Sequence, residues 1–354
     1  MPEQQAAKPV GADAIAATQA MHPLRVVAFT SGAAVPAARF RVRQYVEPLA
    51  RLGIELQERW PSLGAYPPSR RALRPAWLVG TLVERLPQVA ASWRADITLL
   101  QREMVSTVPT LEGLTRRPRL VDIDDAIHLY RGGLAARHLA ALADLVVVGN
   151  AWLAEVWRNW SPSVEILPTA VDTEVYVPAA VPQHPVIGWI GSAGNLPYLS
   201  DIAPALACVV SRYPGTMIAV CSDSPPQLGD LPVRYVPWSV DVEPDFLASI
   251  TIGVMPLQDH LWERGKCSFK MLQYMAAGRP CVVSPIGMNS EILHQAELGL
   301  AANTLSEWTE ALSALLDDPV AAGRMGQVGR ALAEARYSVN ALAPRLAELL
   351  HRLT

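Results

Sequence analysis

The sequence predicts an α/β protein built from two doubly wound parallel β-sheets, each with helices on both faces. One reason is the length of 354 residues, which at about 150 residues per domain allows about two domains. Another is that short apolar runs alternate with stretches of helix length in two successive series, each opening with a strand, a small-residue loop and a helix. With 51% hydrophobic and 18% charged residues, the chain can bury sizeable cores, which excludes general disorder.

The first series starts at residues 25–29, an apolar run typical of a buried strand. A loop of small residues follows at 30–38, and then an amphipathic stretch that Gly53 ends. Further predicted strands lie at 96–100, 120–123 and 145–148. The segments between them are long enough for helical crossovers, which indicates a parallel sheet.

The second series begins after residues 178–185, whose repeated prolines exclude a regular helix and predict a linker. A strand at 186–190 leads into a glycine loop at 191–195 and a helix from about Leu199. Further strands are expected at 216–220, 233–236, 252–255 and 280–284, and closing helices at 307–316 and 344–353. We therefore expect two Rossmann-like domains that face each other across a cleft.

These patterns predict four segments. They are a disordered tail at 1–21, a first Rossmann-like domain at 22–178, a second Rossmann-like domain at 179–335, and a C-terminal helix at 336–354 that we expect to pack back on the first domain. The tail lacks the basic start and apolar core of a secretory signal. No apolar run is long enough to span a bilayer. The four cysteines lie far apart without a C-x-x-C pair, which predicts reduced thiols in the cytoplasm and neither a zinc site nor a disulfide framework.

The second glycine loop is a candidate phosphate site. A loop between a strand and a helix presents backbone N–H groups and the positive end of the helix dipole, which suit phosphate. Neither loop matches G-x-G-x-x-G, so the alternative is that the glycines only allow tight turns. Two such loops in facing domains favour a nucleotide between them. The candidates here are Gly191, Ser192, Gly194 and Asn195.

The lysines are unusual in number and position. The chain has 27 arginines and only 3 lysines, and Lys266 and Lys270 are four residues apart. On a helix beginning just after Gly265 they would share one face, where a diphosphate would meet two ammonium groups and the helix dipole. The alternative is a solvated surface pair. The net charge of −3 gives no whole-protein field that would attract nucleic acid.

Other charged residues follow the predicted strands of the first series. Arg39 and Arg43, at i and i+4, could face a phosphate or the acceptor, or simply begin a solvated helix. Asp124, Asp125 and His128 lie at the carboxyl end of a predicted strand, where open α/β sheets bind ligands. There they would bind acceptor hydroxyls or serve acid–base chemistry, although aspartate also caps helices.

A basic segment precedes an apolar one in the first domain. Arg70, Arg71 and Arg74 come directly before the apolar residues 75–86. Such a segment can rest on a membrane or contact a lipid-linked acceptor. The interpretation we favour is a helix with one face in the core.

Several segments together resemble the retaining glycosyltransferases of family 4. They are residues 143–176, with the turn Pro-Thr-Ala-Val-Asp at 168–172, residues 265–284, with Met-Ala-Ala-Gly-Arg-Pro at 275–280, and residues 287–292, 317–319, 323–329 and 337–338. The resemblance implies a GT-B fold, a nucleotide-sugar donor on the C-terminal domain, an acceptor on the N-terminal domain, and no required metal. It also implies that Ser268, Gln273, Asn289 and Glu291 lie in the donor site.

The resemblance has a gap at its acidic positions. Members usually carry two glutamates eight positions apart, and here those positions are Gly265 and Gln273. Gln273 can still hydrogen-bond ribose hydroxyls through its amide. Glu263 lies nearby in a different register.

The resulting expectation is a cytoplasmic, metal-independent and hexosyltransferase-like retaining enzyme with a nucleoside diphosphate sugar as co-substrate and no cofactor. It would act on a hydroxyl acceptor in the biosynthesis of a glycan, lipid-linked saccharide or glycoconjugate. We also expect the protein to make weak peripheral contact with the inner face of the membrane. The alternatives are a non-catalytic nucleotide-sugar-binding partner subunit and a nucleotide-sugar epimerase on the same fold.

Overall fold

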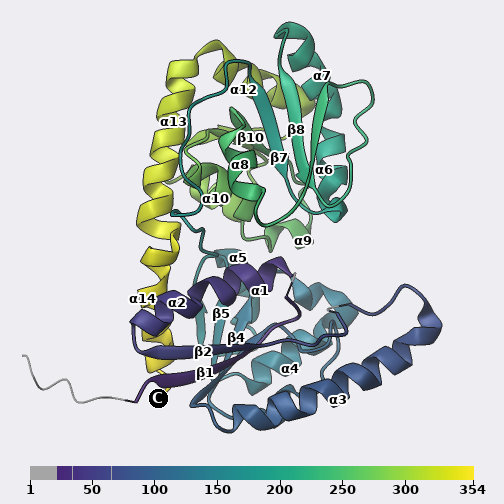
Figure 1. The fold of residues 1–354 in the computed structure, drawn as a ribbon, viewed down its shortest axis with the longest axis vertical. Helices are drawn as coiled ribbons and strands as arrows, with labels where there is room; N and C mark the ends of the chain where they lie inside the picture. Colours follow the sequence, from purple (N-terminus) through teal and green to yellow (C-terminus); the bar gives the residue numbers. More distant parts are fainter. Residues whose placement is uncertain (1–21, 34, 65) are drawn as a thin grey trace, which may run out of the picture.

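The computed structural model describes residues 22–354 except 34 and 65, so the predicted disordered tail at 1–21 lies outside the described residues. Within that part the chain forms two six-stranded parallel sheets, one above the other in Figure 1. We refer to the units built on them as the N-terminal and C-terminal domains. The predicted fold class is confirmed.

The N-terminal sheet has the strand order β2-β1-β3-β4-β5-β6. Four of its strands were predicted, and β2 and the three-residue strand β6 were not. β2 is an edge strand in which buried Ile54 and Leu56 alternate with exposed Glu55 and Gln57, so it lacks the continuous apolar run of its neighbours. The strands are β1 (Leu24–Phe29), β2 (Ile54–Arg59), β3 (Ile97–Gln101), β4 (Arg119–Ile123), β5 (Leu145–Val148) and β6 (Val164–Ile166).

The C-terminal sheet has the order β12-β11-β10-β7-β8-β9, in which consecutive strands run outward on both sides from β7 and β10. This is the Rossmann order, with its switch point between β7 and β10. The strands are β7 (Val186–Ile190), β8 (Met217–Ser222), β9 (Val233–Pro237), β10 (Ile252–Met255), β11 (Cys281–Val283) and β12 (Gly299–Ala301). Only the short edge strand β12 was not predicted.

Helices cover both faces of each sheet (Figure 1). Those before the linker are α1 (Pro36–Arg41), α2 (Val46–Arg51), α3 (Arg74–Ser92), α4 (Leu134–Leu142) and α5 (Ala151–Trp157). Those after it are α6 (Leu196–Asp201), α7 (Ala203–Arg212), α8 (Glu243–Ala248), α9 (Leu261–Arg264), α10 (Phe269–Ala276), α11 (Met288–Leu293), α12 (Leu305–Asp317), α13 (Pro319–Leu332) and α14 (Val339–His351).

The last helix joins the two domains. In Figure 1, α13 and α14 form a column along one side of the molecule, from the upper domain to the lower one. Buried residues of α14 such as Leu342, Leu346 and Leu350 share a core with Val26 of β1 and other residues of the N-terminal domain. The chain therefore finishes its N-terminal core with its final segment.

Two helix starts differ from the prediction, and both affect candidate residues. The helix α1 ends at Arg41 because Val42 has φ −128°, so Arg39 and Arg43 do not share one helical face. The helix α10 begins at Phe269 instead of after Gly265, because the preceding Ser268 has the left-handed value φ +53°. Lys266 therefore lies in the loop before the helix that carries Lys270.

The helix α3 has a buried face and an exposed apolar face. Thr81, Arg85 and Val89 are buried against the domain, as expected of a helix with one face in the core. Val79, Val83 and Leu86, spaced by four and three residues, are more than half exposed. Among the described residues, no helix is both long and apolar enough to cross a bilayer.

Candidate functional site

The two domains meet at the loop 264–268, which precedes α10. Asn150, which follows β5, donates two hydrogen bonds from Nδ2 to this loop, to the carbonyl oxygens of Arg264 (3.2 Å) and Lys266 (3.1 Å). The Cys267 thiol lies 3.2 Å from the carbonyl oxygen of Asp124. The loop that carries Lys266 therefore rests directly on the carboxyl edge of the N-terminal sheet.

Glycine is required on both sides of this contact. A Cβ on Gly265 would lie 2.8 Å from both the Cβ and the backbone nitrogen of Ala126. A Cβ on Gly149 would lie 2.1 Å from Sγ of Cys267. Position 265 thus has no room for the glutamate that the resembled family carries, because the N-terminal domain occupies that space.

Lys266 and Lys270 converge on the glycine loop after β7. Lys266 Nζ lies 3.3 Å from Oδ1 of Asn195. Lys270 Nζ lies 5.6 Å from the ring centre of Trp189, and a Cβ on Gly191 would lie 2.6 Å from the Lys270 Cε. Within the described part of the chain, neither lysine forms an ion pair with a carboxylate.

Lys270 is poised to bind an anion. Burial and, to a smaller extent, the charge of Lys266 lower the pKa of its ammonium group to about 7, while the charge of Asp125 opposes the shift. An ammonium group in these surroundings is stabilised by a negative partner. Two lysines without carboxylate partners beside a strand–loop–helix turn are therefore suited to a diphosphate.

The glycine loop is partly held by its own domain. The Ala193 N–H donates to Oδ1 of Asp223 (2.5 Å), and Asn195 Nδ2 donates to Oγ of Ser192 (2.8 Å). Ser192 and Gly194 are exposed at its tip. The Ala193 amide is thus already engaged within the C-terminal domain.

Gln273 belongs to a buried network that connects the domains. Its Nε2 donates to the hydroxyl of Tyr176 (3.2 Å), which donates to Oε2 of Glu243 (2.6 Å). Arg39 of α1 and the indole N–H of Trp238 also donate to the Glu243 carboxylate, at 2.7 and 2.8 Å. Burial, followed by the charge of Glu243, raises the pKa of Tyr176. Arg39 is therefore bound to the C-terminal domain, and no local sequence signal indicated Glu243 or Tyr176.

Of three further residues predicted in the donor site, two support the backbone and the third lies near the start of α5. Ser268 is buried and makes the left-handed turn into α10. Asn289 is fully buried, and its Nδ2 donates to the carbonyl of Ser284 (2.9 Å). Glu291 is near the N–H of Ala151, which favours the charged carboxylate, and the larger effect of partial burial raises its pKa.

The two predicted acids are held by an arginine that the sequence did not indicate. Arg102 Nε lies 2.6 Å from Oδ1 of Asp124, and its guanidinium also pairs with Asp125. Burial raises the pKa of Asp125, while the charges of Arg102 and of Lys266 across the interface favour its ionised form. This places Asp125 and the lysine pair on opposite sides of the same interface.

His128 lies among aromatic rings. Its ring centre is 5.4 Å from that of Trp152 and 6.0 Å from that of Trp160. Burial lowers the pKa of His128, so its neutral form is favoured. The side-chain hydrogen bonds of Asp124 and Asp125 in the described part of the chain come from Gln101 and Arg102 and not from His128.

Arg43 is engaged within its own domain. Its Nε and NH2 groups each lie 2.9 Å from an oxygen of Glu58, and NH1 donates to the carbonyl of Ala33. Its neighbour Arg41 is buried against Asp122, with Nε 3.1 Å from Oδ2. Both side chains stabilise the loops at the carboxyl edge of the N-terminal sheet.

Two cavities lie beside these elements. A cavity of about 560 Å³ is formed by residues after β10, β11 and β12 together with α6, among them Tyr198, Asp201, Gln258, His260 and Asn303. Its lining contains no lysine or arginine and none of the predicted donor residues, so it is less suited to a diphosphate than the lysine pair.

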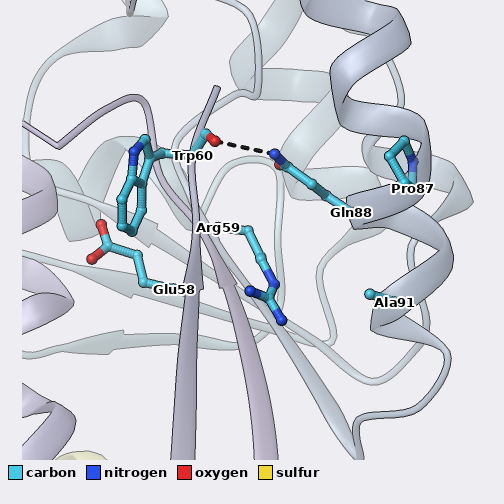
Figure 2. A pocket seen from close by; sticks show the side chains of 6 residues that line it. All are labelled: Glu58, Arg59, Trp60, Pro87, Gln88 and Ala91. Atoms are coloured by element: carbon cyan, nitrogen blue, oxygen red, sulfur yellow. Dashed lines mark hydrogen bonds between the residues drawn. The ribbon is translucent and has the colours of Figure 1, made fainter. Parts of the chain in front are cut away.

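A second cavity of about 360 Å³ lies between the end of β2 and α3 (Figure 2). The Gln88 amide in its wall donates to the Trp60 carbonyl (3.1 Å), and Glu58 is engaged by Arg43. Its polar groups are thus largely paired already. No group of three or more His, Cys, Asp or Glu side chains that could hold a metal occurs among the described residues.

Two Rossmann-like domains whose carboxyl edges meet at a shared interface define the GT-B class of proteins. Residues 184–318 match the family model described as Glycosyl transferases group 1. The C-terminal domain is therefore similar to the glycosyl transferases group 1, and the expected resemblance is confirmed.

Solved structures agree on the fold. Sucrose-phosphate synthase from Thermosynechococcus elongatus is 15% identical with a TM-score of 0.70, over 93% of this chain and 98% of that one. Anabaena HepE in complex with UDP and glucose is 14% identical, with a TM-score of 0.68 over 94% and 100%. WaaG, a glycosyltransferase involved in lipopolysaccharide biosynthesis, is 14% identical, with a TM-score of 0.65 over 92% and 99%. Curated protein sequences provide no match.

Proposed function

We propose that the protein is a retaining glycosyltransferase that moves a sugar from a nucleoside diphosphate sugar to a hydroxyl acceptor. The observation that carries this proposal is the convergence of Lys266 and Lys270, without carboxylate partners among the described residues, beside the Gly191 loop. The site lies at the domain interface of a GT-B fold. The UDP and UDP-glucose complexes of HepE, on the same fold, support a diphosphate-linked donor.

In the proposed reaction the bond between the sugar C1 and the β-phosphate oxygen breaks, and a bond between C1 and the acceptor oxygen forms on the same face. The acceptor proton passes to the departing phosphate. Lys266 and Lys270 stabilise the charge that develops on that phosphate, an interaction that strengthens in the transition state. They supply this charge without a metal ion.

The acceptor is proposed to approach from the N-terminal domain. Asp125 belongs to the N-terminal domain and is near enough to the lysine pair for its charge to favour their protonated forms, and its carboxylate can accept a hydrogen bond from a hydroxyl. Asp124 also pairs with Arg102 and helps to fix the guanidinium that holds Asp125. The acceptor classes that fit are a glycan, a lipid-linked saccharide or another glycoconjugate.

A non-catalytic nucleotide-sugar-binding subunit is the second candidate. It is favoured by the glycine at position 265 and by the engagement of Gln273 with Tyr176, which leave the family's two glutamate positions without a free carboxylate. Binding of the donor without turnover would distinguish it from the transferase. Conversion of the donor sugar without an acceptor would instead indicate an epimerase.

Peripheral membrane contact is proposed for the N-terminal domain. The exposed apolar face of α3, with Val79, Val83 and Leu86, lies close in sequence to the exposed Arg70 and Arg71. Apolar side chains beside arginines suit a surface of anionic lipids.

The test uses UDP, GDP, ADP and dTDP, followed by the corresponding glucose conjugates. A diphosphate that binds the native state should raise the midpoint of thermal unfolding, and its sugar conjugate should slowly release the free diphosphate.

Lys266→Ala and Lys270→Ala should each weaken binding about tenfold to a hundredfold, since each removes a charge-assisted contact. Arg324→Ala, which removes an exposed positive charge on α13, should bind as the wild type does. Equal binding by the lysine variants would contradict the phosphate site, and binding without turnover would contradict the transferase.

A further inference from the structure

Asn150 makes a contact that the proposed function alone does not require. Its side chain is 1% exposed, and it lies between the first turn of α5 in one domain and the donor loop of the other. Its Oδ1 accepts a hydrogen bond from the N–H of Leu153 (2.8 Å) and so caps α5. Its Nδ2 uses both hydrogens on the carbonyls of Arg264 and Lys266, at 3.2 and 3.1 Å.

These two carbonyls flank Gly265 and set the course of the chain just before α10. The loop has short backbone bonds of its own, from Gly265 N to the Trp262 carbonyl (3.1 Å) and from Lys266 N to the Glu263 carbonyl (3.1 Å). It then continues through the left-handed Ser268. The path of the chain from Lys266 into α10 therefore depends on the bonds from Asn150 in the opposite domain.

We propose that Asn150 is a positioning residue that couples closure of the two domains to the diphosphate site. With the domains in contact, Asn150 fixes the loop, and the fixed loop presents Lys266 beside Asn195 and leads into the turn that carries Lys270. With the domains apart, both carbonyls lose this partner and the lysines lose their common arrangement. The inference rests on the proposed function, because it treats the two lysines as donor ligands.

The capping role and the positioning role can be separated by substitution. Asparagine, aspartate and serine cap helices about equally well, so Asn150→Asp and Asn150→Ser should retain the α5 cap. An ionised aspartate has no hydrogen to donate, and the serine side chain is too short to reach both carbonyls. Because one variant introduces a charge and the other does not, a shared effect follows from the lost donors. Asn159→Asp is the control, since Asn159 is exposed in the turn just after α5 and its side chain bonds to the carbonyls of Glu155 and Val156 in that helix.

The first measurement is hydrogen exchange of peptides covering residues 262–268, which needs no ligand. Exchange should be faster in both Asn150 variants than in wild type and in Asn159→Asp, while peptides covering α5 stay protected. The second is binding of the diphosphate that wild type prefers among UDP, GDP, ADP and dTDP. Both Asn150 variants should bind it about tenfold more weakly, since two neutral hydrogen bonds are lost. Because Asn150 is buried, both variants should also melt at a lower temperature, so binding is measured well below the melting temperature of each protein.

The outcomes separate this inference from the proposed function. Faster exchange of 262–268 with weaker binding supports it. Unchanged exchange, or wild-type affinity in either variant, overturns it even if the lysine variants lose binding. If wild type binds no diphosphate, the proposed donor site is wrong and the coupling inferred here falls with it, whatever the exchange of the loop.

Discussion

The protonation of Lys270 should be coupled to the binding of an anion. Burial and the neighbouring Lys266 bring its pKa down to about 7, far below that of an exposed lysine. A bound diphosphate would favour the protonated form and raise the pKa again. Binding therefore includes uptake of a proton whenever the free protein has released it.

The affinity for a nucleoside diphosphate should accordingly depend on pH. Below pH about 7 Lys270 is protonated before binding, and the affinity is at its full value. Above it the affinity should fall by up to about tenfold per pH unit, because a proton must be taken up, until the pH reaches the higher pKa of the complex. Isothermal titration calorimetry in buffers of different ionisation enthalpy would measure both the affinity and the proton uptake.

Lys270→Ala provides the control for this prediction. It should bind weakly at all pH values and without proton uptake above pH about 7, so that any remaining trend reports ionisation of the ligand itself. The same pH dependence in wild type and variant would show that Lys270 is not the titrating group.

Gly265 and Gln273 show how single positions acquire their meaning from distant neighbours. The departure from the family's glutamates was evident in the sequence. The physical reason for this departure was not evident in the sequence. Gly265 is in contact with Ala126 and Gln273 with Tyr176, and both partners are far away along the chain. A sequence pattern indicates local geometry. It does not indicate which loop of another domain occupies the space next to a given side chain.

At the scale of elements, α1 and α8 are connected by the ion pair between Arg39 and Glu243. The side chains are 21% and 5% exposed, and Glu243 also accepts hydrogen bonds from Tyr176 and Trp238. This carboxylate is therefore buried with three donors around it. Loss of one donor leaves a buried charge less completely paired.

Arg39→Ala should lower the free energy of unfolding by about 2 kcal/mol, in urea denaturation followed by tryptophan fluorescence. Arg51→Ala removes an exposed pair with Glu47 and should change stability by less than about 0.5 kcal/mol. Equal effects of the two substitutions would show that the Arg39–Glu243 pair adds no more than a surface ion pair does.

Elements with strong periodicity were predicted well, and weakly patterned ones were not. The strands from β7 to β11 are continuous apolar runs or nearly so, whereas β2 is half exposed and β12 has only three residues. The predicted start of α10 was wrong because Ser268 has a left-handed backbone conformation, which serine rarely adopts. The presence of a strand or helix can be predicted from the hydrophobic pattern. The residue at which a helix begins depends on backbone angles that this pattern does not indicate.

At the scale of the whole molecule, α3 reaches outward from one side of the N-terminal domain (Figure 1). Its exposed Val79, Val83 and Leu86 are not covered by any other described element. With Arg70 and Arg71 close by in sequence, this side of the domain should favour an anionic surface.

Wild-type protein should therefore cosediment more with vesicles of phosphatidylglycerol and phosphatidylcholine than with vesicles of phosphatidylcholine alone, and less at high salt. The double variant Val79→Glu and Val83→Glu should lose most of this binding. Val320→Glu, at an exposed position of α13 in the other domain, should keep it. Wild-type binding that is equal on both kinds of vesicle, or unaffected in the double variant, would contradict peripheral contact through α3.

By itself the sequence determined the two α/β series, the glycine loop after β7 and the two lysines of the C-terminal domain, because these depend on hydrophobic periodicity and on residue type. Only the tertiary structure decided what each candidate touches. It joined Arg39 to Glu243, Asp125 to Arg102 and Asn150 to the lysine loop. The physical reason is that these contacts form when two separately folded sheets bring their carboxyl edges together, and no local pattern encodes which loops then meet.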